Sequence, residues 1–128
     1  MGGMVIIGAG ECGTRAAFAL REQGWTGPVT LVGAENGLPY ERPPLSKPEG
    51  SGARRKAICD GAQLDGAGID YRPGLSATAI DRAARTVALS DGRALPYARL
   101  LLATGSDPFI IPVPGRDLPG VVTFRDLS

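Results

Sequence analysis

A glycine-rich turn near the N-terminus constrains this chain more than any other feature. The apolar run Met4–Ile7 leads directly into the sequence Gly8–Gly13, which has the pattern Gly-x-Gly-x-x-Gly. In a strand–turn–helix unit with this spacing, Gly8 permits the tight turn and Gly10 lets a pyrophosphate approach the backbone. Gly13 lets the helix pack close to the strand. The pattern predicts a dinucleotide site at the first turn of the chain.

The surrounding sequence supports this interpretation. Alanines and leucines recur at helical spacing after the glycines, Gly24 ends that helix, and the apolar run Val29–Val32 predicts a second buried strand. The positive end of the helix dipole would bind phosphate without a basic side chain, and Glu35 is placed to accept hydrogen bonds from ribose hydroxyls. A βαβ unit without any ligand remains the open alternative.

The amino-acid composition limits the kinds of partner and active site that this chain can have. The 128 residues carry a formal net charge of +1, no histidine, and the cysteines Cys12 and Cys59. This charge balance favours neither nucleic acid nor an anionic membrane surface as a partner. The distance between the cysteines excludes the close thiol pair of a disulfide reductase, so chemistry is expected from a cofactor and no metal site is expected. We interpret Cys12 as a small buried packing residue.

The rest of the chain predicts an α/β fold, a Rossmann-like parallel sheet with a small antiparallel β-meander, in one domain over residues 1–128. A proline-rich loop spans 36–48, and a weak helix is expected over 58–67. Strands are expected over 69–72, 77–80, 86–89 and 93–95, with Asp91-Gly92 as a hairpin turn. The apolar run 100–103 predicts a separate, fully buried strand, and the segment 108–128 is broken by proline and glycine. No apolar stretch has transmembrane length and no signal-type leader is evident, so a soluble cytoplasmic protein is expected.

Three motifs in order along the chain carry a family resemblance. They are the glycine fingerprint, the loop Leu38–Lys47 with its Arg-Pro-Pro-Leu-Ser-Lys sequence, and the run Leu101–Gly105. Together with Val113–Val121 they resemble the N-terminal part of FAD-dependent ferredoxin reductases of the putidaredoxin and rhodocoxin reductase type, within the pyridine nucleotide-disulfide oxidoreductase superfamily. The fold implied is the FAD-binding domain of glutathione-reductase-like proteins.

The resemblance also implies roles for individual residues. It implies that Gly8, Gly10 and Gly13 hold the FAD pyrophosphate and that Glu35 holds the adenosine ribose. Further FAD-binding positions that it implies are Arg42 along the cofactor, Lys47 near flavin N5 as the catalytic residue, Ala77 at the adenine, and Ala103, Thr104 and Gly105 closing over the cofactor. Solvated loop charges at Arg42 and Lys47 remain alternatives, as does a plain strand end at Ala103–Gly105.

The activity implied is transfer of electrons from NAD(P)H through FAD to an iron–sulfur ferredoxin. Members of the family are far longer and carry a second glycine fingerprint, of which this chain has none. We therefore expect a truncated portion that is catalytically inactive alone, and whose apolar surface associates with itself or with a missing domain. The glycine pattern alone does not distinguish FAD from NAD. A stand-alone dinucleotide-binding module without catalysis is the alternative function.

Overall fold

The structure is a computed structural model that describes residues 2–43 and 56–126. It begins with strand β1 (Gly3–Ile7), helix α1 (Glu11–Glu22) and strand β2 (Val29–Gly33), with β2 parallel to β1. Gly24, at φ +95°, ends the helix, and the backbone N–H of Trp25 donates to the Leu20 carbonyl. The expected βαβ unit and its helix stop are confirmed.

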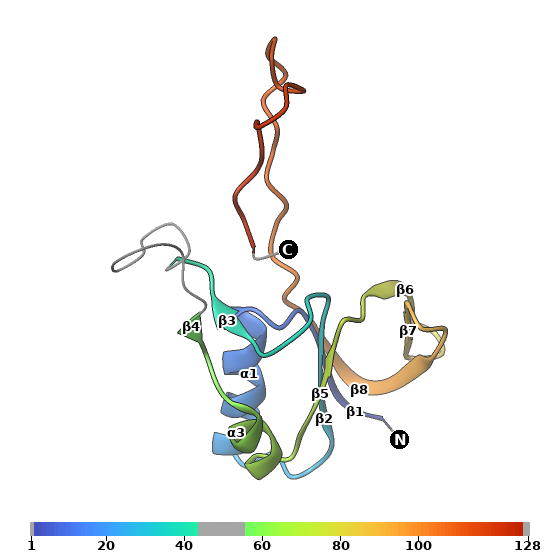
Figure 1. Ribbon diagram of the computed structural model, residues 1–128. Helices are drawn as coiled ribbons and strands as arrows, with labels where there is room; N and C mark the ends of the chain where they lie inside the picture. The colour runs from blue at the N-terminus through green and yellow to red at the C-terminus, as the bar shows by residue number, and fades with distance from the viewer. Residues whose placement is uncertain (1, 44–55, 127–128) are drawn as a thin grey trace.

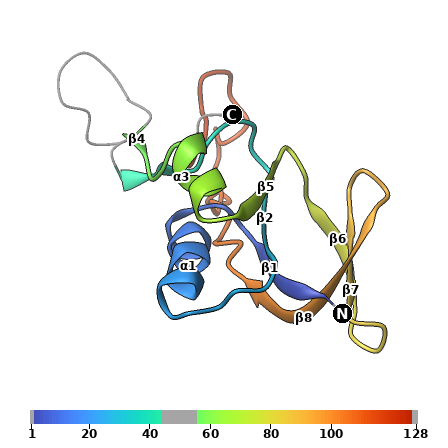
Figure 2. The ribbon, with the colours of Figure 1, turned by 90° about the horizontal axis from the view of Figure 1, so that it is seen from below.

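A six-stranded sheet forms the body of the molecule, in the order β5-β2-β1-β8-β7-β6 (Figures 1 and 2). Strands β5 (Ile69–Pro73), β2, β1 and β8 (Ala94–Leu102) are parallel. Strands β7 (Thr86–Leu89) and β6 (Ala77–Asp81) continue the sheet in antiparallel fashion. This is the expected parallel sheet with an antiparallel meander, and β8 belongs to both parts.

Short elements complete the described chain. Strand β3 (Tyr40–Glu41) pairs antiparallel with β4 (Lys56–Ala57), and helix α3 (Gly61–Gly66) follows. Asp60 caps α3, accepting from the Gln63 backbone N–H while the Gln63 side chain accepts from the Asp60 N–H. The weak helix expected over 58–67 is therefore present in a shorter form, and this capping box explains where it begins.

Buried side chains form a core on each face of the sheet. On the helix face, Ile6 and Leu31 pack with Ala17 of α1 and Leu64 of α3. On the opposite face, Val5, Ile7 and Val32 pack with the meander residues Val87, Leu89 and Leu95. Alternate residues of β1 thus point into different cores, which explains why its sequence is apolar without interruption.

Strand β8 departs from the sequence prediction in two ways. It runs without a break from Ala94 to Leu102, whereas two separate strands were expected. The run 100–103 was also predicted to be fully buried, yet the exposed fractions of Leu101 and Leu102 are 40% and 58%. Leu101 pairs with Ile6 and so faces the helix side, where the core built from the described residues includes none of β8, while Leu102 lines a cavity. An apolar run in the sequence therefore predicts a strand, but it does not predict whether other elements bury that strand.

The segment after β8 leaves the body of the molecule. Residues 103–126, which we call the arm, contain no helix or strand, extend away from the sheet and turn back toward it (Figure 1). The large apolar side chains of the arm are at least half exposed; they are Phe109, Ile110, Ile111, Val113, Leu118, Val121, Val122 and Phe124. The expectation of a segment broken by proline and glycine is confirmed. Across the described residues, no helix is long and apolar enough to cross a membrane.

Candidate functional site

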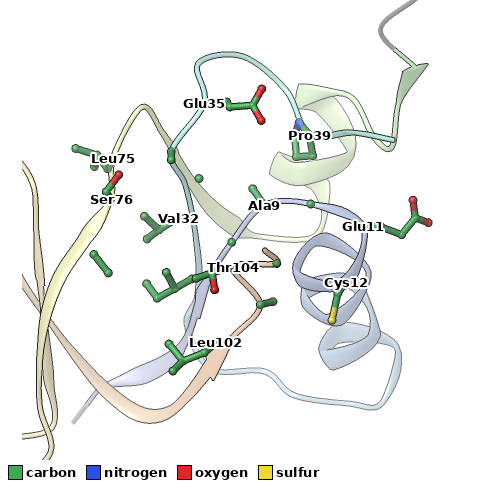
Figure 3. A pocket seen from close by; sticks show the side chains of 18 of the residues that line it. Ala9, Glu11, Cys12, Val32, Glu35, Pro39, Leu75, Ser76, Leu102 and Thr104 are labelled. Carbon is green, nitrogen blue, oxygen red and sulfur yellow. The ribbon is translucent and has the colours of Figure 1, made fainter. Parts of the chain in front are cut away.

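A cavity of about 850 Å³ opens at the carboxyl ends of β1, β2 and β8. In open α/β sheets this edge is where ligands bind. The glycine turn, the end of β2, the β5–β6 turn and the first residues of the arm contribute to its lining. Figure 3 shows Leu75 and Ser76 on one side, Glu11 and Cys12 on the other, and Val32, Leu102 and Thr104 between them. The glycine fingerprint, the described start of the proline-rich loop and the end of the run Leu101–Gly105 therefore line one site.

Two of the three glycines are required by packing. Gly8 has φ +114°, and a Cβ there would lie 2.0 Å from the carbonyl oxygen of Ala103. A Cβ on Gly13 would lie 1.8 Å from the carbonyl oxygen of Gly8. Any larger residue at either position would collide with backbone, so these glycines let α1 and β8 approach the turn. Gly13 is buried beneath the turn and is not part of the cavity wall.

Gly10 differs from the other two. It lines the cavity at φ −81° and ψ −162°, a conformation open to any L-residue, and a Cβ there would meet no atom of the described residues within 4 Å. Packing therefore does not explain a glycine at this position. Gly10 is also the N-cap of α1 and supplies no side-chain cap, so the first amides of the helix face the cavity edge without a side-chain acceptor from the cap. Both features fit a phosphate group lying against the backbone.

Backbone hydrogen bonds hold the cavity walls at the strand ends. The Gly8 N–H donates to the Val32 carbonyl at 2.8 Å, and the Ala103 N–H donates to the Ile7 carbonyl at 2.8 Å. The Gly74 N–H donates to the Glu35 carbonyl at 3.1 Å, which joins the β5–β6 turn to the end of β2. Hydrogen bonds to the ends of the strands therefore hold the turns that line the cavity in place.

Glu35 stands at the end of β2 with both carboxylate oxygens engaged. Oε2 accepts from the Tyr40 hydroxyl at 2.5 Å, and Oε1 accepts from the Arg42 guanidinium at 3.2 Å. The Arg42 guanidinium also lies over the Tyr40 ring, 5.9 Å from its centroid. Tyr40 was part of the proline-rich loop in the sequence, but nothing there indicated that it would reach Glu35.

Arg125 is a cavity residue that the sequence did not reveal. It lies far along the arm, yet it lines the cavity beside Gly105, where a Cβ would lie 3.2 Å from its guanidinium. Its carbonyl accepts from Arg42 at 2.9 Å. Its Nε is buried and has no hydrogen-bond partner within the part of the chain that the structure describes. No local motif marks it, because only the return of the arm brings it to the site.

The structure brings most of the predicted site residues together. The cavity is lined by Gly8, Gly10, Glu35, Arg42, Ala77, Ala103, Thr104 and Gly105. Lys47 lies outside the described residues, as does most of the loop that carries it. No group of three or more possible metal ligands occurs among residues 2–43 and 56–126.

The two cysteines occupy different surroundings. Cys12 was expected to be buried, but it is exposed, because its place in the first turn of α1 lies on the cavity wall and not against the sheet. Cys59 is buried in the helix-face core. Burial raises the pKa of the Cys59 thiol above its ordinary value, and the neighbouring Asp60 charge raises it further. Cys59 therefore acts as an apolar packing residue.

Known proteins resemble nearly the whole chain. It is 43% identical to rhodocoxin reductase of Rhodococcus erythropolis over 125 residues, which cover 95% of this chain and 29% of the relative. It is 46% identical over 105 residues to the ferredoxin–NAD(+) reductase component of the anthranilate 1,2-dioxygenase system of Burkholderia cepacia, covering 80% and 26%. The chain thus spans under a third of the length of these relatives.

A solved structure shows the same architecture. The ferredoxin reductase for the CYP199A2 system from Rhodopseudomonas palustris superposes with a TM-score of 0.89 at 31% identity, covering 98% of this chain and 32% of that one. The Rossmann-like fold expected from the sequence is therefore confirmed. The model of the pyridine nucleotide-disulphide oxidoreductase family matches residues 3–128. This chain belongs to the pyridine nucleotide-disulphide oxidoreductase family.

Proposed function

We propose that the cavity binds FAD, with the adenosine diphosphate half against the first βαβ unit. The observation that carries this proposal is that Gly10, the uncapped start of α1 and Glu35 line the same cavity. These groups match a phosphate followed by a ribose. Family membership supports a flavin in place of NAD at this first site.

Each wall of the cavity has a role in this proposal. The α1 amides bind the pyrophosphate, Glu35 accepts from the ribose hydroxyls, and Ala77 lies at the adenine. Arg125 adds a positive charge whose Nε has no partner among the described residues. Ala103, Thr104 and Gly105 close the site from the end of β8. Lys47 is proposed, from the family resemblance alone, to lie near the flavin ring.

The proposed activity is electron transfer from NAD(P)H to an iron–sulfur ferredoxin, with residues 1–128 as one partial FAD-binding domain. The relatives named above are ferredoxin reductases, which supports this assignment. Bound FAD would accept a hydride and release electrons singly, while the protein binds and orients it and controls its electrostatic surroundings. The 128-residue chain carries one glycine fingerprint, so we expect no steady NADH oxidation by it alone.

Titration of the chain with FAD, FMN and NAD tests the cofactor assignment. FAD should bind saturably, which a change in flavin absorbance or fluorescence would report. FMN, which lacks the adenosine monophosphate part and keeps one of the two phosphates, should bind at least about tenfold more weakly because it loses the adenosine ribose and part of the pyrophosphate contacts. Tighter binding of NAD than of FAD would favour the non-catalytic dinucleotide module. Equal binding of FMN and FAD would contradict the placement of the adenosine half.

A further inference from the structure

We propose that Tyr40 is a positioning residue that sets the Glu35 carboxylate to select an unsubstituted ribose diol. The inference rests on the proposed function, because it concerns the same cavity. It goes further by assigning to Tyr40 the orientation of the Glu35 carboxylate, and to the free ribose hydroxyls the recognition of the nucleotide. Its basis is the geometry around Glu35.

Tyr40 is itself firmly held. It is 5% exposed and lies in β3, which pairs antiparallel with β4, and the Ile58 N–H donates to the Pro39 carbonyl at 2.9 Å directly beside it. Because the ring is buried and the backbone is paired, the hydroxyl has little freedom to leave Glu35. A fixed donor of this kind lowers the entropy cost of orienting the carboxylate when a ligand binds.

The partners of Glu35 are of one chemical kind. The Tyr40 hydroxyl and the Arg42 guanidinium both donate, one to each carboxylate oxygen. Each carboxylate oxygen has two acceptor positions and accepts one hydrogen bond from the described residues, so within that part of the chain each retains capacity for one further donor. The Glu35 side chain is 27% exposed and lines the cavity, so an incoming ligand can reach that capacity.

A ribose with free 2′ and 3′ hydroxyls offers two adjacent donors to this carboxylate. A 2′-phosphate would instead bring acceptor oxygens and negative charge against Glu35, which is unfavourable. The arrangement therefore favours the unphosphorylated ribose of FAD, ADP or NAD. Tyr40 matters because loss of its hydroxyl would leave one carboxylate oxygen free to turn away from the ligand.

Calorimetric titration with ADP and with 2′,3′-dideoxy-ADP measures how strongly the chain prefers a nucleotide with free ribose hydroxyls. The full chain should prefer ADP by at least about tenfold, since two hydrogen bonds to a charged acceptor are lost without the hydroxyls. Tyr40→Phe should reduce that preference to about threefold or less. Its affinity for 2′,3′-dideoxy-ADP should stay within about twofold of the original, because that ligand never uses the carboxylate.

Tyr71→Phe is the matched control. Tyr71 lines the same cavity, and its hydroxyl donates to the backbone carbonyl of Gly37 at 2.5 Å, not to Glu35. This variant should leave the preference for ADP unchanged, even if it alters affinity for both ligands. An equal shift with both ligands is the signature of a structural role, and the positioning role would change the ratio.

The outcomes separate this inference from the proposed function. An unchanged preference in Tyr40→Phe, or an equal loss for both ligands, would overturn the role of Tyr40 and leave the nucleotide site intact. Failure of the unmodified chain to bind either ligand would contradict the proposed function itself. If circular dichroism shows that Tyr40→Phe is unfolded, Glu35→Gln replaces it, because its amide retains only one acceptor oxygen. A full preference for ADP in Glu35→Gln would also overturn the inference.

Discussion

The first βαβ unit and the arm are both rich in glycine and apolar residues, yet the structure treats them in opposite ways. In the first unit, Gly8 and Gly13 lie against backbone atoms and Leu31 is fully buried. In the arm, a Cβ on Gly120 would meet no atom of the described chain within 4 Å, and Val122 is 83% exposed. The same residue types are packed against neighbours in the first unit and are largely exposed in the arm.

A pair of hydrogen bonds from one arginine joins these regions near the cavity. Arg42 pairs with Glu35 through one nitrogen and donates to the Arg125 carbonyl through another. The Arg125 side chain then completes the cavity wall. The arm is therefore tied to the body at the proposed ribose end of the cofactor site, while its apolar tip stays exposed.

We expect the largest difference in stability loss between the two regions when a glycine of each is replaced. Gly13→Ala would place a Cβ 1.8 Å from a backbone oxygen, and backbone there has little room to relax. We expect a loss of about 3 kcal/mol or more in the free energy of unfolding, measured by urea denaturation. Gly120→Ala should cost about 1 kcal/mol or less, since only its φ of +91° is strained. Equal losses would break the contrast.

Shortening an apolar side chain should also destabilise the first βαβ unit more than the arm, by a smaller difference. Leu31→Ala removes a side chain that is 0% exposed in the helix-face core, and should cost about 3 kcal/mol of unfolding free energy. Val122→Ala should change stability by less than about 0.5 kcal/mol, because that side chain already meets water. A large destabilisation by Val122→Ala would show that the tip of the arm is packed in solution, through self-association for example. Repeating the measurement at several protein concentrations identifies that case.

The smallest expected effect concerns the tie between the two regions. Trypsin can cleave the arm after Arg116 and after Arg125, and in both places the next residue is aspartate. Arg42→Ala removes a hydrogen bond to the Arg125 carbonyl worth about 1 kcal/mol, so cleavage after Arg125 relative to Arg116 should rise about fivefold. Arg15→Ala, which removes an exposed charge paired with Glu11, is the control. An unchanged ratio in Arg42→Ala would mean that the tie does not hold the arm.

Local sequence signals predicted the parts of the fold that local physics determines. The glycine spacing located the first turn, Gly24 located the end of α1, and alternating apolar residues located the meander. Each of these signals works through steric or periodic constraints within a few residues of the chain. The same holds for Glu35, whose place at the end of β2 follows from the βαβ unit.

Features that depend on distant parts of the chain were not predictable in this way. Arg125 joins the cavity only because the arm turns back, and the backbone of Tyr40 is paired with β4, which lies far along the sequence. The exposure of Leu101 depends on which elements cover the helix side of β8. Cys12 was placed wrongly because helical position, not residue type, decides its burial. Sequence patterns report what a segment forms more reliably than what it touches.

We propose that this chain holds the adenosine diphosphate part of a dinucleotide against Gly10 and the start of α1. Calorimetric titration of the full chain and of Gly10→Val with ADP tests this placement, because the backbone at Gly10 is extended and a Cβ there would meet no atom of the described residues within 4 Å. We expect saturable one-to-one binding that weakens at least about tenfold in Gly10→Val, while the free energy of unfolding falls by no more than about 1 kcal/mol because valine is a poorer N-cap than glycine. Equal binding by both proteins, or no binding by the original chain, would contradict it.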